Sequence, residues 1–259
     1  MDFEFIRLYN DGPVGWLEYH RPPRNAFHAS MVREVMAGLK SLQADPRARV
    51  IVIGSALEQW FSVGAEMQVF GRMDQQGMRV WADMAHDVVR LLRASAKPLL
   101  AAIHGTAVGG GLEMTYHCDV RFCAGDARLG QPEISIGFIP PIGATQSLAR
   151  LLGRSRAIRF LYDGEIIGAQ QALAIGLVDE LVPPGELRAR VQAYGEALAE
   201  KPPEALAAIR RTITVGMDLP YEEALALEHQ AVVELGGTRN FKEGVRAFLE
   251  KRKPEWERD

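Results

Sequence analysis

Short apolar runs alternate with amphipathic segments along the first half of the chain. Residues 50–53 (Val-Ile-Val-Ile) and 97–103 (Lys-Pro-Leu-Leu-Ala-Ala-Ile) are nearly all apolar, and each is followed closely by a glycine. Around them, residues 30–42 and 78–93 carry apolar side chains three and four positions apart, the period of a helix with one buried face. Buried strands separated by helices pair in parallel, so this alternation predicts an α/β fold.

The two ends of the chain have different patterns. Residues 3–19 predict a β-hairpin around the turn Asn10-Asp11-Gly12-Pro13, and Ser30 is expected to cap the helix that follows. The middle of the chain predicts helices at 112–117 and 143–152 and strands at 119–124 and 128–129. After Pro183-Pro184 the periodicity is helical throughout, at 186–200, 204–214, 221–235 and 241–251. We therefore expect a mixed core over residues 1–185 and a helical C-terminal region over residues 186–259.

Composition narrows the class of protein. The chain has 259 residues with 47% hydrophobic content, enough for a full core, and its formal net charge is only -3. Its 30 basic and 33 acidic residues are mixed along the chain, which argues against a nucleic-acid partner. Two cysteines, Cys118 and Cys123, are expected to be buried thiols in a reducing compartment. No stretch resembles a targeting peptide or reaches the roughly 20 apolar residues of a membrane span, so a cytoplasmic protein without a membrane partner is expected.

Two glycine-bearing turns are candidates for holding an anionic oxygen. In the first, residues 103–113 predict a strand, a turn at Gly109-Gly110-Gly111 and the start of a helix, whose free N–H groups would face a guest at Gly110. Such donors act most strongly where negative charge develops in a transition state. The second turn, residues 60–66, contains Gly64 and could bring another N–H to the same oxygen. Either turn could instead serve close packing or a tight turn alone.

Glu113 and Glu133 are the candidate acid and base. Glu113 lies in the first turn of its predicted helix, where the helix dipole could stabilise a carboxylate without any catalytic duty. Glu133 precedes the apolar residues 134–139, where a partly buried carboxyl is costly unless it has a role. As a pair beside two donor-rich turns, they suit activation of water by one carboxyl and protonation of carbon by the other.

Other kinds of site have weaker signals. The chain has no Walker A motif, no G-x-G-x-x-G spacing at these turns and no G-x-S-x-G elbow. The group His117-Cys118-Asp119 with Cys123 does not match a zinc spacing, so a cluster at a helix end is preferred and no metal is expected. Lys251-Arg252-Lys253 could offset a helix dipole, stay solvated or clamp a phosphate.

Several segments, taken together and in order, resemble the crotonase superfamily, also called the enoyl-CoA hydratase/isomerase family, over essentially the whole chain. These segments are Arg21-Pro22-Pro23-Arg24-Asn25-Ala26-Phe27, residues 61–66, residues 101–119 with Gly-Gly-Gly-x-Glu and Cys-Asp, Gly130-Gln131-Pro132-Glu133, Thr145-Gln146, and Phe241-Lys242-Glu243-Gly244 with Phe248-Leu249. The resemblance implies a spiral of ββα units, a helical C-terminal region used in assembly of a homotrimer or a dimer of trimers, and an acyl-CoA thioester substrate. Coenzyme A would enter as part of the substrate, without a separate cofactor.

The resemblance also implies roles for particular residues. The N–H groups of Ala65 and Gly110 would hold the thioester oxygen, Glu113 would orient and activate water, and Glu133 would protonate the α-carbon, as in an enoyl-CoA hydratase. The remaining expected substrate-binding residues are Arg24 and Ala26 near the adenine and phosphates, Gly64, Glu66, Gly109, Pro132, Pro141 and Ile142 around the thioester and acyl group, and Lys251 and Lys253 reaching from a neighbouring subunit. A double-bond isomerase, a hydrolase that cleaves a β-keto acyl-CoA, and a non-catalytic homologue are the alternatives.

Two positions depart from the family's pattern. Hydratases usually have Pro-Gly-x-Gly-Gly-Thr where this chain has Pro-Pro-Ile-Gly-Ala-Thr at 140–145. Pro141 removes a backbone donor and Ile142 adds bulk beside the expected proton donor, which suggests a branched or cyclic acyl group. Glu66 stands where many members have aspartate.

Overall fold

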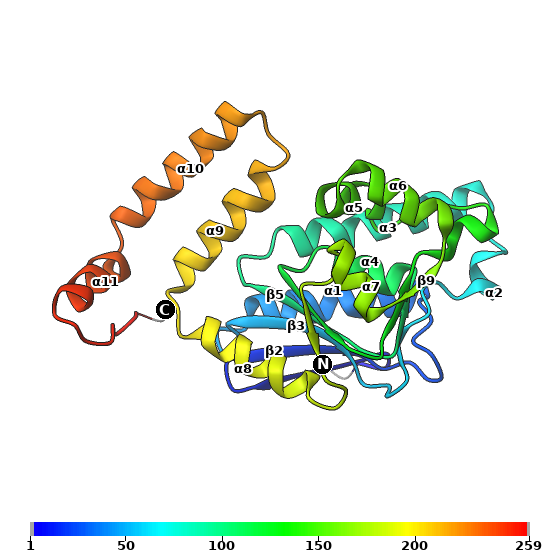
Figure 1. Cartoon of the computed structure of the whole chain (residues 1–259), viewed down its shortest axis with the longest axis horizontal. Helices are drawn as coiled ribbons and strands as arrows, with labels where there is room; N and C mark the ends of the chain where they lie inside the picture. The colour runs from blue at the N-terminus through cyan, green and yellow to red at the C-terminus, as the bar shows by residue number, and fades with distance from the viewer. Residues whose placement is uncertain (1–2, 258–259) are drawn as a thin grey trace.

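The computed structural model describes residues 3–257, which form two β-sheets surrounded by helices (Figure 1). The strands are β1 (Ile6–Asp11), β2 (Val14–Tyr19), β3 (Val50–Ser55), β4 (Trp60–Ser62), β5 (Leu99–Ile103), β6 (Thr106–Val108), β7 (Val120–Ala124), β8 (Arg128–Gly130), β9 (Ile166–Gly168) and β10 (Glu180–Val182). The helices are α1 (Ala29–Ala44), α2 (Met67–Phe70), α3 (Gln75–Arg93), α4 (Gly110–Thr115), the 3₁₀ helix η1 (Pro132–Ile136), α5 (Ala144–Leu152), α6 (Arg154–Asp163), α7 (Ala169–Ile175), α8 (Leu187–Ala199), α9 (Pro203–Gly216), α10 (Tyr221–Gly236) and α11 (Arg239–Leu249).

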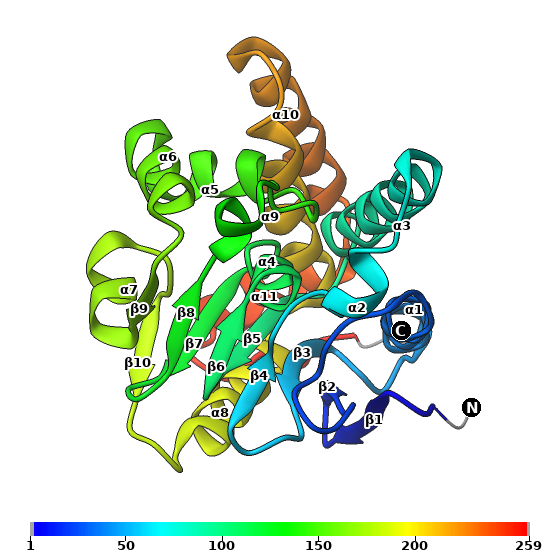
Figure 2. The same cartoon turned by 90° about the vertical axis from the view of Figure 1, so that its right-hand side faces the viewer.

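The chain alternates between the two sheets. The larger sheet has the order β1-β2-β3-β5-β7-β10 and is parallel from β2 onward, whereas the smaller has the order β4-β6-β8-β9. In β3–β4, β5–β6 and β7–β8, the first strand joins the larger sheet, the second joins the smaller, and helical structure follows (Figure 2). The α/β fold with a spiral of ββα units is therefore confirmed.

Neighbouring side chains of β2 show how the larger sheet is covered on both faces. Leu17 packs towards α1, where its Cδ1 lies 3.0 Å from the position a Cβ would take on Gly38. On the opposite face, the indole of Trp16 donates to Gln192 of α8 at 2.9 Å. Successive side chains of a strand point to opposite faces, so helices on both sides bury the central strands β3 and β5 completely. This burial explains why β3 and β5 are continuous apolar runs.

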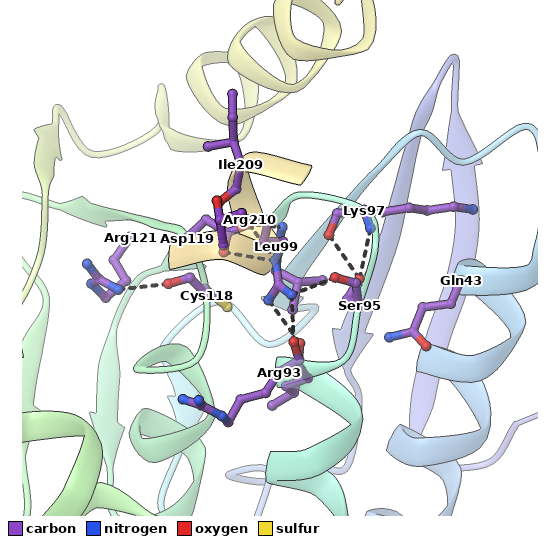
Figure 3. A network of polar contacts seen from close by, with 12 residues as sticks. Gln43, Arg93, Ser95, Lys97, Leu99, Cys118, Asp119, Arg121, Ile209 and Arg210 are labelled. Carbon is purple, nitrogen blue, oxygen red and sulfur yellow. Dashed lines mark hydrogen bonds and ion pairs between the residues drawn. The ribbon is translucent and has the colours of Figure 1, made fainter. Parts of the chain in front are cut away.

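The last three helices extend away from the core (Figure 1). One of their attachments to the core is the guanidinium of Arg210 in α9, a residue that is 7% exposed. Arg210 donates to Asp119 at 3.0 Å and to three backbone carbonyls at the end of α3, those of Leu92, Arg93 and Ser95, at 2.6 to 2.9 Å (Figure 3). Asp119 in turn accepts from the N–H of Leu99, so the network joins α9 to the start of β5.

Replacing Arg210 with leucine should lower the free energy of unfolding by roughly 3–5 kcal/mol, because the change leaves Asp119 and three carbonyls without their shared donor. Arg211→Leu is the matched control, since the Arg211–Glu234 ion pair is about half exposed and worth about 0–1 kcal/mol. Thermal unfolding of both variants beside the parent measures the difference. Equal midpoints for the two variants would contradict the anchoring role of Arg210.

Some local predictions were wrong for identifiable reasons. The cap of α1 is His28, whose Nδ1 accepts from the N–H of Met31 at 3.1 Å, whereas Ser30 lies inside the helix. Strand β1 continues through Asn10 and Asp11, which were expected to form the turn. The apolar residues 134–139, for which no burial was predicted, expose Ile134 and Ile136 in η1 and Ile139 after it. The C-terminal helices α8–α11 match the prediction closely.

Candidate active site

The two predicted glycine turns meet in the structure. Gly64 has φ +78° and Gly109 has φ +55°, conformations that L side chains rarely adopt. A Cβ on Gly64 would lie 3.2 Å from both the Cα of Gly109 and the N of Gly110. The two backbones are therefore too close for a side chain to fit between them. Gly111 is as tightly placed, since its Cβ would lie 2.2 Å from the Cβ of Ser62. The glycines are thus required for contact between the turns.

The N–H groups of Ala65 and Gly110 are left without partners inside their elements. Ala65 pairs with Phe27 in an isolated parallel bridge, in which Phe27 donates to the carbonyl of Gly64 at 2.7 Å and accepts from Glu66 at 2.8 Å. In such a bridge the middle residue directs its own N–H away from the partner strand. Gly110 is the first residue of α4, where N–H groups have no intrahelical acceptor. Both residues can therefore donate to a guest.

Glu113 is completely buried one turn into α4. Its Oε2 accepts from the N–H of Ile142 at 2.6 Å and from that of Ala144 at 3.4 Å, whereas its Oε1 has no hydrogen-bond partner among residues 3–257. Burial, followed by the nearby Glu133 carboxyl, raises the pKa of Glu113 well above its usual range, and the two backbone N–H groups oppose this shift. One oxygen is thus held in place while the other is available to a water molecule.

Glu133 lies in η1 against the glycine turn of α4. Its Oε1 is 3.0 Å from the position that a Cβ would take on Gly109. The amide of Gln131 donates to both Glu133 oxygens, at 3.1 and 3.0 Å, and accepts from the Tyr116 hydroxyl at 2.9 Å, the orientation that satisfies both ends of the amide. Burial raises the pKa of Glu133 to about 7. Burial therefore raises the pKa of both carboxyl groups above the ordinary glutamate value.

Gln131 and Tyr116 were not anticipated from the sequence as supporting residues. Gln131 is 1% exposed and Tyr116 is 7% exposed, and burial raises the pKa of the Tyr116 hydroxyl well above its usual range. Gln131 stood beside Pro132 and Glu133 in a recognised segment, and that adjacency was a usable signal. No sequence signal marked Tyr116, because its contact is made only through the fold.

The segment before α1 is tied to the second glycine turn by charge. Arg21 donates to the carboxylate of Glu66 at 2.6 Å and to the carbonyl of Ala26 at 2.7 Å. The guanidinium of Arg24 lies over the Trp60 ring, 5.0 Å from its centre. Glu66, the residue that departs from the family's usual aspartate, therefore reaches an arginine that holds the chain beside Ala26.

The unusual segment at 140–145 lies against Gly110 and Glu113. Pro141 offers no N–H, but the next residue, Ile142, supplies the donor to Glu113. The Ile142 side chain is buried, and its Cδ1 lies 3.0 Å from the position of a Cβ on Gly110. The added bulk thus faces the glycine turn directly.

The structure does not bring every predicted residue together. Lys251 and Lys253 are exposed beyond α11, in the region that projects from the core (Figure 1). The side chains considered as metal ligands have other partners: His117 contacts the Ile142 carbonyl, and Asp119 binds Arg210. Over residues 3–257, no cluster of three or more His, Cys, Asp and Glu side chains could hold a metal ion, and no helix is long and apolar enough to cross a membrane. Both cysteines are buried free thiols.

Comparisons of the sequence and of the structure with known proteins indicate the same family. The Enoyl-CoA hydratase/isomerase family matches residues 11–259. A probable enoyl-CoA hydratase of Bacillus subtilis (strain 168) is 34% identical over 97% of this chain and 98% of its own, and a crotonyl-CoA hydratase of Syntrophomonas wolfei is 32% identical over 98% of each. A crystal structure of an enoyl-CoA hydratase from Bacillus anthracis superposes with a TM-score of 0.93 at 30% identity, over 99% of this chain and 100% of the other. The chain belongs to the enoyl-CoA hydratase/isomerase family, and it is an enzyme of the hydro-lyase type.

Proposed function

We propose that this enzyme adds water across the 2,3-double bond of an enoyl-CoA thioester. The observation that carries the proposal is the meeting of a buried carboxyl group, Glu113, and a part-buried one, Glu133, with the backbone N–H groups of Ala65 and Gly110. Addition of water to an enoyl thioester needs a base for water, an acid for carbon and a site for the enolate oxygen that forms between these steps. The four groups supply these three functions.

The two N–H groups would stabilise the enolate. Negative charge builds up on the thioester oxygen as water attacks, and donors fixed by the backbone need no reorganisation at that moment. The close approach of Gly64 to Gly109 and Gly110 supports this placement of the two donors. The thioester oxygen would accept from Ala65 on one side and from Gly110, at the positive end of α4, on the other.

Glu113 would activate the water and Glu133 would protonate the α-carbon. This division is supported by the unpartnered Oε1 of Glu113, which can accept a proton from water while Oε2 stays fixed by Ile142. Glu133 is less buried than Glu113 and lies against Gly109, next to the proposed enolate site. Water would lose its proton to Glu113 as its oxygen bonds to the β-carbon, and the α-carbon would take the proton of Glu133.

Coenzyme A would be bound as part of the substrate. Arg24 and the backbone at Ala26 are the proposed contacts for its adenine and phosphates, supported by the position of both residues beside the Gly64 turn. Lys251 and Lys253 would reach the 3′-phosphate from a neighbouring subunit. Gly64, Glu66, Gly109, Pro132, Pro141 and Ile142 would surround the thioester and the acyl group.

The kcat/KM of hydration should fall as the pH is lowered through about 7. Burial raises the pKa of Glu133 to about 7 and that of Glu113 well above its usual range. The reaction needs one carboxylate and one carboxylic acid, so the pair loses its base when it takes up a second proton. Hydration rates measured between about pH 5 and about pH 9 locate this acid limb. A limb near 4.5, the ordinary glutamate value, would contradict the proposed environment.

The reaction is tested by following the loss of enoyl-thioester absorbance with crotonyl-CoA, a branched enoyl-CoA and cyclohex-1-ene-carboxyl-CoA. Water addition is expected, with oxygen-18 from labelled water in the product. Unlabelled product of unchanged mass would indicate isomerisation, and a cleaved carbon skeleton from a β-keto ester would indicate the hydrolase. No turnover of any ester would favour a non-catalytic role.

The bulk of Ile142 beside Gly110 supports a branched or cyclic acyl group as the preferred substrate. The side chain occupies space next to the proposed enolate oxygen, so it would select the shape of the acyl group that can approach both carboxyls. The same panel of esters tests this selection. Comparable turnover of crotonyl-CoA and the cyclic ester would count against it.

Assembly into a homotrimer or a dimer of trimers is also proposed. The projecting helices expose many large apolar side chains, among them Ile209, Ile213, Val232, Val233, Phe248 and Leu249. Exposed apolar surface on this scale is typical of an interface between proteins. Light scattering of the purified protein should give three or six times the 28.6 kDa chain mass, and a monomer would refute the assembly.

A further inference from the structure

His117 lies immediately past α4 and contacts the segment that holds Glu113. Its Nε2 is 2.9 Å from the carbonyl oxygen of Ile142, and its Nδ1 is 3.4 Å from the hydroxyl of Ser147. Ile142 is the residue whose N–H donates to Glu113 at 2.6 Å. One backbone residue is therefore held by His117 on its carbonyl side while it holds the carboxyl on its amide side.

The chemistry of these contacts determines the form of the imidazole. A carbonyl can only accept, so Nε2 carries the proton and Nδ1 is free to accept from the Ser147 hydroxyl. Burial lowers the pKa of His117 to about 4, and the positive charges of Arg93 and Arg210 act in the same direction. The ring is consequently neutral, with a fixed tautomer, throughout the neutral range.

The segment next to Ile142 leaves the ring little freedom to shift. Pro140 and Pro141 have fixed φ angles on one side. On the other side Gly143 has φ +76°, and a Cβ added there would lie 3.4 Å from the Cε1 of His117. The imidazole thus packs on the turn as well as bonding to it, which couples the ring to the direction of the Ile142 N–H.

We propose that His117 is a positioning residue for the carboxyl that activates water, acting through the backbone of Ile142. The inference rests on the proposed hydration reaction and deepens it. By fixing Ile142, His117 keeps the Oε2 of Glu113 bound to a backbone donor and its Oε1 directed at water. Loss of the imidazole would allow the 140–143 segment to move, and Glu113 would lose both its orientation and the N–H groups that oppose the rise in its pKa.

A hollow of about 350 Å³ beside the ring allows the role to be tested by chemical rescue. His117 and Gly143 form one wall, and Val89, Arg90 and Gln146 are among the residues around it. His86 lines the same hollow but is exposed, and within residues 3–257 it makes no hydrogen bond to the 140–143 segment. Free imidazole is small enough to enter a space of this size once the His117 side chain is removed.

The experiment compares His117→Ala, His117→Gln and His86→Ala with the parent in full pH profiles of hydration. For His117→Ala we expect kcat to fall roughly 10- to 100-fold with little change in KM, and the acid limb to move to higher pH because Glu113 has lost donors that stabilise its charged form. Added imidazole should restore both the rate and the limb in part. His117→Gln, which keeps an N–H donor, should lie between, and His86→Ala should match the parent.

Two outcomes would overturn the inference. An unchanged acid limb in a folded His117→Ala variant, whatever its rate, would show that His117 does not act on Glu113. A folded His117→Ala variant that does not respond to imidazole, beside an equally impaired His117→Gln variant, would show a packing role only. If the alanine variant fails to fold, a folded His117→Gln variant that has lost the rate although it keeps an N–H donor would show the same. Failure of the proposed function is distinct, because then the parent itself would not hydrate any ester.

Discussion

Replacing Glu113 with glutamine is expected to lower the rate of enoyl-CoA hydration roughly a thousandfold while KM stays within about threefold. Glutamine has the same length as glutamate, and its amide oxygen can still accept from the N–H of Ile142, now 2.6 Å from Oε2. The local fold should therefore persist. A neutral amide cannot take a proton from water, so the step that needs a base is lost. Initial rates from the loss of enoyl-thioester absorbance measure the effect.

Glu58→Gln is the matched control for this substitution, because Glu58 is an exposed glutamate in the loop between β3 and β4. It should keep the parent rate. Glu133→Gln should be as inactive as Glu113→Gln in water addition, since both carboxyls are needed. A Glu113→Gln variant within about tenfold of the parent would remove Glu113 from its role as base. Isomerisation that survives in one of the two variants would move the reaction to the isomerase class.

Periodicity predicted the parts of the fold that are buried on both sides or amphipathic over several turns. Strands β3 and β5 were found at their apolar runs, because both faces of the sheet are covered by helices. Helices α8 to α11 were found almost at their observed ends. In each case the tertiary environment is uniform along the element, so the sequence records it directly.

Two of the second strands of the ββα units, β4 and β6, were missed, whereas β8 lies at the strand predicted for residues 128–129. Strands β4 and β6 have three residues each, and their sequences, Trp60-Phe61-Ser62 and Thr106-Ala107-Val108, read as parts of glycine turns. Such short strands are stabilised by pairing with their neighbours in the smaller sheet and by packing. They are too short to show a hydrophobic periodicity in the sequence. These are the strands that lead directly into the two glycine turns of the candidate site.

The candidate site was predictable to the extent that its residues sit in recognisable local segments. The glycine turns and the two glutamates each had a signal from their immediate neighbours in sequence. Apart from the place of Gln131 beside Glu133, the supporting contacts had none, because Tyr116 meets Gln131 and His117 meets Ile142 only when β8, η1 and α5 are folded around α4. Side chains that position others are therefore the part of such a site that only the structure reveals.

Gly109→Ala should reduce kcat/KM roughly 100- to 1000-fold, comparable to the loss of one donor from an oxyanion site. Gly109 has φ +55° and ψ -142°, a region that is nearly restricted to glycine. An added Cβ would lie 3.0 Å from the Oε1 of Glu133 and 3.3 Å from the Cα of Gly64. It would push Glu133 outward and separate the two turns, so the N–H groups of Ala65 and Gly110 could no longer reach one oxygen.

The strain of a methyl group at positive φ must be separated from its collision with the site, and Gly153 allows this. Gly153 has φ +79° and ψ +152°, equally unsuited to alanine, but a Cβ there would meet no atom of the described part of the chain within 4 Å. Gly153→Ala and Gly109→Ala should each lower the free energy of unfolding by about 1–3 kcal/mol, whereas only Gly109→Ala should lose activity. Steady-state kinetics and thermal unfolding of both variants distinguish the effects. Equal activities would mean that contact between the turns is a packing requirement, and the enolate oxygen would then have to be held by other donors.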